Sequence, residues 1–350
     1  MTIELIAPPP RANPDLLGHE AAEATLRQNF DAGRLPHALL LTGPRGIGKA
    51  TLAFRLARYV LSTRDETTSH DMFGDAAAAS PGGSLAVLPE SGVFRRVAGG
   101  GHADLLTVER AYDPRRKRLR GEIVVVDTRE VGAFLRLTSA EGGWRVVIVD
   151  GADEMNRNAA NSLLKILEEP PRRALLILVA HSVGRLLPTI RSRCRHVPLA
   201  PLSDAVVRDL LARYCPDLDP NEADAVVALA EGSIGRALEL VASGGVELSN
   251  ALTAMLARRG GIDVLALHGF ADRLARPDAE DSYRTVEELL RQHVAHLAID
   301  AARRGTHAEA ARWAKVRSEI GDAFARADGL NLDRKQTIMS AVWAIDRAAG

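Results

Sequence analysis

The chain has 350 residues, of which 46% are hydrophobic, and this length predicts two or three domains with sizeable cores. Its 45 basic residues balance 45 acidic ones, so no global charge indicates a nucleic acid or an anionic membrane as partner. The 4% aromatic content argues against an aromatic nucleic-acid platform, and Cys194 and Cys215 alone cannot form a disulfide framework. Because the opening residues lack a secretory signal pattern and no apolar run could span a bilayer, we expect a soluble cytoplasmic protein.

The first expected elements form one strand–helix unit. Three consecutive prolines, Pro8 to Pro10, cannot share a helix or a central strand, so residues 1–14 are expected to be a loose lead-in. The apolar pattern then predicts an amphipathic helix over 18–33, a buried strand over 38–42 and a helix over 49–62. Residues 63–104 are rich in Gly, Pro, Ser and Ala without periodicity, which predicts a long surface insertion.

Strands and helices alternate in the next part of the chain. Strands are expected over 122–128, 144–150 and 175–180, and helices over 129–138 and 160–169. The strands are apolar throughout rather than alternately apolar, which is typical of a parallel sheet covered on both faces. A short extended stretch, CRHVPLAPL, follows, and beyond Pro201 only helices are expected, in a small unit and then a longer Ala- and Leu-rich region.

The turn after the first strand, GPRGIGKAT, is one letter away from the phosphate-loop pattern G-x-x-x-x-G-K-[ST]. Its glycines are Gly43, Gly46 and Gly48. Backbone N–H groups in such a loop cradle phosphate oxygens, and Lys49 would reach the β and γ phosphates. Ala50 stands where Ser or Thr would hold magnesium, and Thr51 lies about 100° further around the helix, so it cannot fully replace that hydroxyl. The alternative is an ordinary glycine-rich turn.

The strand WRVVIVD ends in Asp150, which is the pattern of a magnesium-coordinating carboxylate at the carboxyl edge of a sheet. A hydrolysing site usually follows this residue with a glutamate that activates water, but here Gly151 follows. Asp153 and Glu154 come later, beyond the end of the strand. The alternative is a strand that simply ends in a capping aspartate. The sequence therefore predicts a nucleotide site with little or no hydrolysis.

A second pair of motifs, SLLKILEEPP and LLPTIRSRC, identifies a family. Together they resemble the clamp-loader branch of the AAA+ ATPases, and most of all its delta-prime subunits from bacterial DNA polymerase III. Supporting stretches are GRLPHALLLTGPRGIGKATLA, HADLLTVER, GGWRVVIVDGADEMN, EGSIGRAL and NLDRKQTIMSAVWAI. The likeness covers residues 15–345 and is densest over 144–202. Without it, the arginines of LLPTIRSRC would be read as a basic surface turn.

The resemblance implies an α/β fold and a multi-subunit assembly. It implies a Rossmann-like AAA+ domain over 1–200 with 63–104 as its insertion, a helical lid over 201–245, and an all-α collar domain over 250–350. In the collar, Trp313 and Trp343 would serve the helical core and a subunit interface. The implied partners are the clamp-loader subunits gamma or tau and delta, the beta sliding clamp, and primed DNA. The chain would thus belong to a DNA polymerase holoenzyme without having a polymerase site.

The resemblance also assigns roles to single residues. Lys49 and Asp150 match the Walker A lysine and Walker B aspartate, Arg236 matches the lid arginine that senses nucleotide, and Arg193 matches the arginine finger offered to a neighbouring ATPase site. Ala50, Gly151 and the pair Ala180–His181 depart from the active pattern; the pair stands where a small polar sensor would end the strand. These departures favour a stator that binds ATP or ADP weakly, or not at all, over a gamma- or tau-type motor.

Three further readings complete the expectations. Many relatives carry a four-cysteine zinc module, but residues 63–104 contain no cysteine, so no zinc is predicted, and His70 and His102 are expected to be exposed or structural. The run RRKRLR, residues 115–120, is expected to be a solvated hairpin tip, with contact to DNA phosphates as the alternative. The rival functions are an active gamma- or tau-type ATPase and a P-loop kinase for a small molecule.

Overall fold

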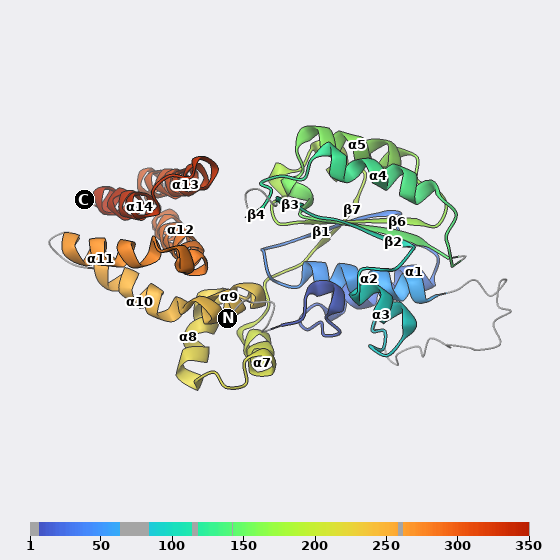
Figure 1. Cartoon of the computed structure of the whole chain (residues 1–350), viewed down its shortest axis with the longest axis horizontal. Helices are drawn as coiled ribbons and strands as arrows, with labels where there is room; N and C mark the ends of the chain where they lie inside the picture. Colours follow the sequence, from blue (N-terminus) through green and yellow to red (C-terminus); the bar gives the residue numbers. More distant parts are fainter. Residues whose placement is uncertain (1–6, 64–83, 114–117, 142, 258–261, 350) are drawn as a thin grey trace. The chain divides into compact units, whose positions relative to one another are not determined.

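The chain separates into two compact units in a computed structural model that describes residues 7–63, 84–113, 118–141, 143–257 and 262–349 (Figure 1). The first, called the α/β unit, comprises residues 4–216 and 231–235. The second, called the helical unit, comprises residues 217–230 and 236–350. In the part of the chain that the structure describes, no helix has both the length and the apolar character that a membrane span requires.

The α/β unit is built on a five-stranded parallel sheet with the order β2-β5-β6-β1-β7. Its strands are β1 (Ala38–Thr42), β2 (Leu105–Val108), β5 (Arg145–Asp150), β6 (Ala174–Ala180) and β7 (Arg195–Pro198). The first strand lies between two that come much later in the sequence, so Leu40 pairs with Leu178 on one side and with His196 on the other. The glycine loop that follows β1 therefore lies inside the carboxyl edge of the sheet, where α/β proteins bind ligands.

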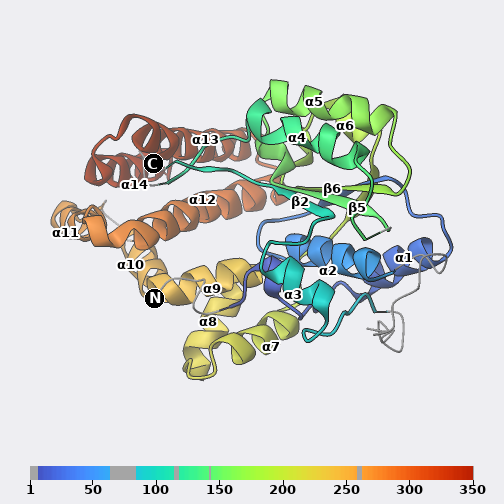
Figure 2. The same cartoon turned by 45° about the vertical axis from the view of Figure 1, so that its right-hand side comes forward.

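Helices cover both faces of this sheet (Figures 1 and 2). On one face lie α1 (Glu20–Asp31), α2 (Lys49–Ser62) and α3 (Gly92–Ala98); on the other lie α4 (Val125–Arg136), α5 (Arg157–Glu168) and α6 (Pro188–Arg191). Alternate residues of β1 enter the two cores: Leu39 and Leu41 pack with α2, whereas Leu40 packs in the core that contains α4 and α5. The continuous apolar strands thus have the covered parallel arrangement predicted from the sequence.

Only helices follow the sheet in the described residues, as expected. They are α7 (Asp204–Tyr214), α8 (Pro220–Ala230), α9 (Ile234–Ser243), α10 (Gly245–Leu256), α11 (Val264–Leu274), α12 (Glu280–Arg303), α13 (His307–Leu330) and α14 (Arg334–Ala349). In the helical unit α12 packs along α13, with the rings of Tyr283 and Phe324 5.1 Å apart between centroids. Trp313 is buried in this core and Trp343 is half-buried.

The prediction of a strand over 122–128 is wrong, because the helix α4 begins at Val125. Only Ile123 makes a strand-like bridge, to Met155. The β-branched run VVVDT favours a strand, but the carboxylate of Asp127 accepts the backbone N–H of Val124 at 2.8 Å and so caps the start of a helix. The short strand β2 was not predicted, since its four residues are mostly half-exposed and too few to show a period.

The lead-in is more ordered than its prolines suggest. Residues Pro10–Ala12 form a 3-10 turn, and the buried guanidinium of Arg58 donates to the carbonyl oxygens of Arg11 at 2.9 Å and Asn13 at 2.8 Å. The same guanidinium lies 4.5 Å from the ring centroid of Phe94, on α3. A helix arginine thus fixes two segments that are remote in sequence, which no local pattern could reveal.

The insertion expected over 63–104 is only partly described, and residues 64–83 lie outside the described residues. From residue 84 onward the chain contributes several buried residues, although residues 88–90 are exposed. Leu85 is 0% exposed, and α3 contributes the buried side chains of Phe94 and Val97. The backbone N–H of Leu85 donates to the buried carboxylate of Glu23 at 2.7 Å. This second half of the insertion therefore belongs to the core beside α2.

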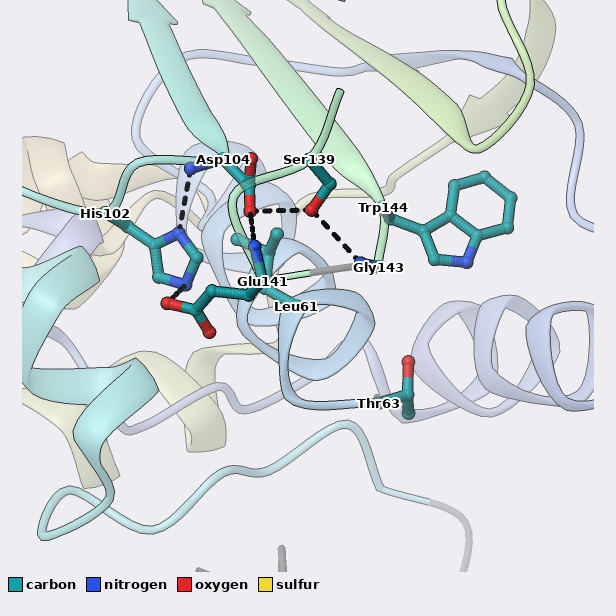
Figure 3. A pocket seen from close by; sticks show the side chains of 8 residues that line it. All are labelled: Leu61, Thr63, His102, Asp104, Ser139, Glu141, Gly143 and Trp144. Atoms are coloured by element: carbon teal, nitrogen blue, oxygen red, sulfur yellow. Dashed lines mark hydrogen bonds and ion pairs between the residues drawn. The ribbon is translucent and has the colours of Figure 1, made fainter. Parts of the chain in front are cut away.

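A polar cluster stands at the amino-terminal edge of the sheet, opposite the glycine loop (Figure 3). Asp104 accepts hydrogen bonds from the hydroxyl of Ser139 at 2.8 Å and the backbone N–H of Ala140 at 2.9 Å and Glu141 at 3.1 Å. Although burial opposes it, these bonds hold the pKa of Asp104 below its usual value. The buried ring of His102 accepts from the N–H of Asp104, and burial lowers its pKa, so it is a neutral structural residue.

Candidate nucleotide site

The loop between β1 and α2 has the backbone that a phosphate cradle needs. Gly43, Gly46 and Gly48 have φ values of +148°, +76° and +101°. A side chain at residue 43 would place its Cβ 2.4 Å from the carbonyl oxygen of Leu199, so only glycine fits there. Gly48 precedes the first residue of α2, where free backbone N–H groups and the helix dipole favour an anion.

Three contacts from outside the motif hold this loop in shape. His19 Nε2 donates to the carbonyl oxygen of Ile47 at 2.6 Å. The hydroxyl of Ser233 donates to the carbonyl of Arg45 at 2.8 Å, and the N–H of Gly235 donates to the carbonyl of Gly46 at 2.9 Å. A Cβ at residue 235 would lie 2.8 Å from the Cα of Gly46, so the two backbones touch. The loop carbonyls are thus satisfied by the protein itself.

Lys49 is the first residue of α2 and is 3% exposed. Its ammonium group donates to the carbonyl oxygen of Pro44, at the start of the same loop. Burial lowers its pKa to about 8, although the nearby carboxylates of Asp150 and Asp153 act against this shift. Lys49 is therefore mainly charged at neutral pH and poised to meet an anion. Ala50 adds no hydroxyl, and Thr51 is buried on α2.

Asp150 ends β5 at the same edge of the sheet, separated from β1 by β6. Burial raises its pKa to about 6, helped by Glu109 and Glu154 and opposed by Lys49. A carboxylate whose charge is disfavoured in this way is one that a cation at the site would stabilise. In the described residues no three His, Cys, Asp or Glu side chains gather in a way that could hold a metal ion by themselves.

The residues that follow Asp150 differ from those expected in a hydrolysing site. Gly151 has φ +84°, and a Cβ there would lie 2.6 Å from Glu154 Oε2. Glu154 itself forms an ion pair with Arg110 at 2.9 Å, so its carboxylate already has a partner. Asp153 accepts the backbone N–H groups of His181 and Ser182 at 3.0 and 2.8 Å. Both acidic residues after β5 therefore have structural partners.

The residue at the end of β6 is also unlike a polar sensor. Ala180 is fully buried and carries no polar group. The ring of His181 follows it, and burial together with the charge of Lys49 lowers its pKa to about 4. His181 is consequently neutral at physiological pH and contributes no positive charge toward a phosphate.

Arg193 lies on the surface after α6. Its side chain is 35% exposed, and its guanidinium forms an ion pair with Glu168 at 2.8 Å and donates to the carbonyl oxygen of Thr189 at 3.0 Å. Both partners belong to α5 and α6 rather than to the glycine loop. Arg191 is exposed at the end of α6, and the neighbouring thiol of Cys194 has its pKa raised to about 11 by burial, so it is unreactive.

Arg236 belongs to the helical unit. On α9 it forms an ion pair with Glu288 at 3.6 Å and donates to the side-chain oxygen of Gln292, both on α12. The loop residues Gly43, Gly46, Gly48 and Lys49 thus come together with Asp150 in the α/β unit, whereas Arg236 is held by its own unit. The roles assigned to these residues stay predictions.

The structure also describes part of the basic segment around residues 115–120. Residues Tyr112–Asp113 (β3) and Arg118–Leu119 (β4) form a two-stranded antiparallel hairpin, as expected for the segment with RRKRLR. The basic residues 115–117 lie outside the described residues. The sequence did not predict that His19 contacts the glycine loop. For the other two contacts, those of Ser233 and Gly235, the one available signal was the motif EGSIGRAL that contains them.

The chain is similar in sequence to several known proteins. Residues 18–203 match the family model described as DNA polymerase III, delta subunit. The DNA polymerase III subunit gamma/tau of Mycobacterium tuberculosis is 31% identical over 288 residues, 80% of this chain and 46% of the relative. The subunit delta' of Pseudomonas aeruginosa is 37% identical over 199 residues, 56% of this chain and 53% of the relative. A gamma subunit-related structure from Thermotoga maritima is 19% identical, with a TM-score of 0.44, over 94% of this chain and all of that one. The chain spans about half the length of these curated relatives.

Proposed function

Because this chain belongs to the DNA polymerase III delta-subunit family of clamp-loader proteins, we propose that it is the delta-prime-type stator of such a loader. In this role it helps gamma or tau and delta subunits to place the beta sliding clamp on primed DNA. Its own nucleotide site binds ATP or ADP weakly and turns over little or none. Arg193 completes the site of the neighbouring ATPase subunit.

The proposal rests mainly on one observation: the site keeps the groups for binding phosphate but lacks groups for hydrolysis. The groups that shape a phosphate cradle are present, since Gly43, Gly48 and Lys49 have the required backbone and charge. The groups that would bind magnesium and activate water are absent at residues 50 and 151. Hydrolysis of a phosphoanhydride depends on both groups, so loss of the two together supports binding without turnover.

The surface position of Arg193 supports the trans role. A guanidinium can neutralise the charge that develops on a transferred phosphoryl group, and an arginine finger contributes about 10³-fold or more to the rate. Arg193 is exposed, and its partners Glu168 and Thr189 hold it in place without burying it. A neighbour could therefore take over the guanidinium at the cost of one surface ion pair, which is worth only about 0–1 kcal/mol.

The domain roles follow from the same proposal. Residues 1–200 would serve as the ATPase-like domain, residues 201–245 as the lid with Arg236 as its nucleotide-sensing arginine, and residues 250–350 as the collar. The second candidate is a gamma- or tau-type motor. The match to gamma/tau over 80% of the chain favours it, whereas Ala50 and Gly151 do not.

Two measurements test the proposal. The isolated chain is mixed with a fluorescent ATP analogue while ATP turnover is followed in the same sample; we expect binding without turnover, and turnover within seconds would establish the motor instead. The loader is then reconstituted with Arg193→Ala or Arg193→Lys. We expect Arg193→Ala to assemble but to lose ATPase by about 10³-fold, with incomplete rescue by lysine, because a point charge cannot reproduce the planar fork. Normal ATPase in the Arg193→Ala loader would disprove the finger.

A further inference from the structure

The glycine loop carries one cation that the phosphate-loop pattern does not require. Arg45 stands between Gly43 and Gly46 in GPRGIGK and is exposed. In the part of the chain that the structure describes, its side chain forms no ion pair or hydrogen bond. Its backbone carbonyl accepts the hydroxyl of Ser233 at 2.8 Å. The backbone is thus fixed at this position, while the guanidinium is available to a ligand.

The charge of Arg45 acts on three groups around the cradle. Burial is the main cause of each pKa shift: it lowers the pKa of Lys49 to about 8 and that of His181 to about 4, and it raises the pKa of Asp150 to about 6. Arg45 adds to the first two shifts and opposes the third. These groups belong to the start of α2, the residue after β6 and the end of β5. Because Coulomb interactions weaken with distance, the guanidinium of Arg45 lies on the side of the loop that faces the cradle.

The donors at this edge of the sheet do not fit a magnesium site of the hydrolysing kind. Such a site holds the ion between a carboxylate, a Ser or Thr hydroxyl and the phosphate oxygens. Asp150 is the carboxylate here, but Ala50 offers no hydroxyl and Thr51 is buried on α2. The two acidic residues that follow Gly151 are engaged with Arg110 and with backbone N–H groups. Asp150 is therefore the one donor of the usual set that remains for the ion.

A bound polyphosphate needs positive charge, which either an ion or the protein can supply. Arg45 and Lys49 are protein cations beside the first turn of α2, where backbone N–H groups and the helix dipole also favour an anion. A guanidinium stays charged and can donate paired hydrogen bonds to phosphate oxygens. Magnesium would bring further positive charge next to both cations, with Asp150 alone to offset it. The charges of the site thus favour phosphate without the ion.

We propose that Arg45 supplies the positive charge that magnesium supplies in a hydrolysing site, so that the cradle binds the polyphosphate of a nucleotide in its magnesium-free form. The inference rests on the proposed function and names the form of nucleotide that the stator takes. It links binding to the lack of turnover, because Arg45 neutralises phosphate without holding the ion that hydrolysis uses. The competing arrangement is magnesium held by Asp150 through water, in which Arg45 has no role.

The test measures the affinity of the purified chain for a fluorescent ATP analogue at one ionic strength, with either excess EDTA or excess magnesium chloride. Inorganic tripolyphosphate is the competitor, because it has the phosphates without a base or a sugar. The variants are Arg45→Gln, which removes the charge, and Arg45→Lys, which keeps the charge without the planar fork. The matched control is Arg34→Gln, at an exposed arginine before β1 and therefore at the opposite edge of the sheet from the glycine loop.

We expect wild type to bind the analogue at least as tightly in EDTA as in magnesium, and tripolyphosphate to displace it. Arg45→Gln should weaken binding in EDTA by about tenfold or more, the loss of one charge-assisted contact, and Arg45→Lys should restore part of it. The control Arg34→Gln should bind within about twofold of wild type, because exposed charges at that distance are screened. Thermal unfolding of the Arg45 variants should match wild type, since this side chain has no partner to lose.

Asp150→Asn distinguishes the two arrangements. Under the proposal it removes a negative charge beside the bound phosphates, so it should tighten magnesium-free binding by about twofold or more. If Asp150 holds magnesium through water, the same substitution weakens binding in magnesium and leaves binding in EDTA unchanged. That result would overturn the proposal.

The other outcomes separate this inference from the proposed function. If magnesium tightens wild-type binding by about tenfold or more, or if Arg45→Gln binds as well as wild type in EDTA, the inference is wrong and a stator that binds without turnover still stands. If tripolyphosphate does not displace the analogue, the base holds it and the inference is again wrong. If wild type binds in neither buffer, the inference fails together with the nucleotide part of the proposed function, while the Arg193 loader assay still decides the stator role.

Discussion

Placing a glutamate at position 151 supplies the carboxylate that a hydrolysing site has there, yet we predict that Gly151→Glu will not start ATP turnover. Residue 151 has a left-handed backbone with φ +84°, which costs a side-chain residue about 1–2 kcal/mol. Its Cβ would lie 2.6 Å from Glu154 Oε2, so Glu154 must leave Arg110. That ion pair is about a quarter exposed and worth about 0–1 kcal/mol, so the free energy of unfolding should fall by about 1–3 kcal/mol.

The assay combines thermal unfolding with ATP turnover at saturating magnesium and ATP. Gly151→Ala is the matched control, because it adds the Cβ without the carboxylate and should show most of the loss in stability. At about 2–4 °C for each kcal/mol, the expected drop in Tm is several degrees for both variants. The reasoning is refuted if Gly151→Glu keeps the wild-type Tm and hydrolyses ATP within seconds, because the site would then lack only its glutamate.

Three further predictions concern buried charges. Burial raises the Asp150 pKa to about 6, so ionising this buried carboxyl lowers the stability of the chain progressively as pH rises from about 4 through 6. Asp150→Asn should therefore stabilise the chain by about 1–3 kcal/mol at pH 8 and clearly less at pH 5. Equal gains in thermal unfolding at both pH values would contradict this. Arg58→Lys should cost about 2–4 kcal/mol in denaturant unfolding, because a compact ammonium lacks the planar guanidinium whose two nitrogens meet separate carbonyls while its plane lies over a ring. A loss below about 0.5 kcal/mol would count against this role. Asp153→Asn should lower the free energy of unfolding by about 1–3 kcal/mol and speed hydrogen exchange at the backbone N–H groups of residues 181 and 182. The reason is that each carboxylate oxygen of Asp153 accepts one of these N–H groups, whereas the asparagine side chain has only one acceptor oxygen. Unchanged exchange would show that Asp153 does not hold these two residues.

The sequence predicted the elements whose signal is local and long. Strands β1, β5 and β6 are continuous apolar runs, and α2 begins at the residue after the glycine loop, so their positions agree with the structure to within a residue. The failures occurred where a local signal competes with a distant contact. VVVDT has strand propensity, but Asp127 caps a helix and the hydroxyl groups of Thr128 and Ser162, on α5, share a hydrogen bond at 2.7 Å. Tertiary context outweighed the β propensity there.

The site was predicted unevenly for the same reason. Motif spacing predicted roles for the loop glycines, Lys49 and Asp150, because each role is tied to a fixed position after a strand, and these residues lie at one edge of the sheet. It could not locate His19, which reaches the loop across 28 residues, or the partners that occupy Asp153 and Glu154. Hydrogen bonds between distant segments leave no spacing rule in the sequence, so only coordinates reveal them.

Contacts within the α/β unit support both the glycine loop and the segment that carries the proposed finger. His19, Ser233 and Gly235 bond the carbonyls of the glycine loop directly, so the loop keeps its shape through protein contacts alone. Arg193 is likewise carried by a helix whose Ile190 is fully buried. A misplacement of about 1 Å can cost about 10²-fold in rate, so a subunit that supplies one guanidinium to a neighbour gains from a fixed framework more than from its own turnover.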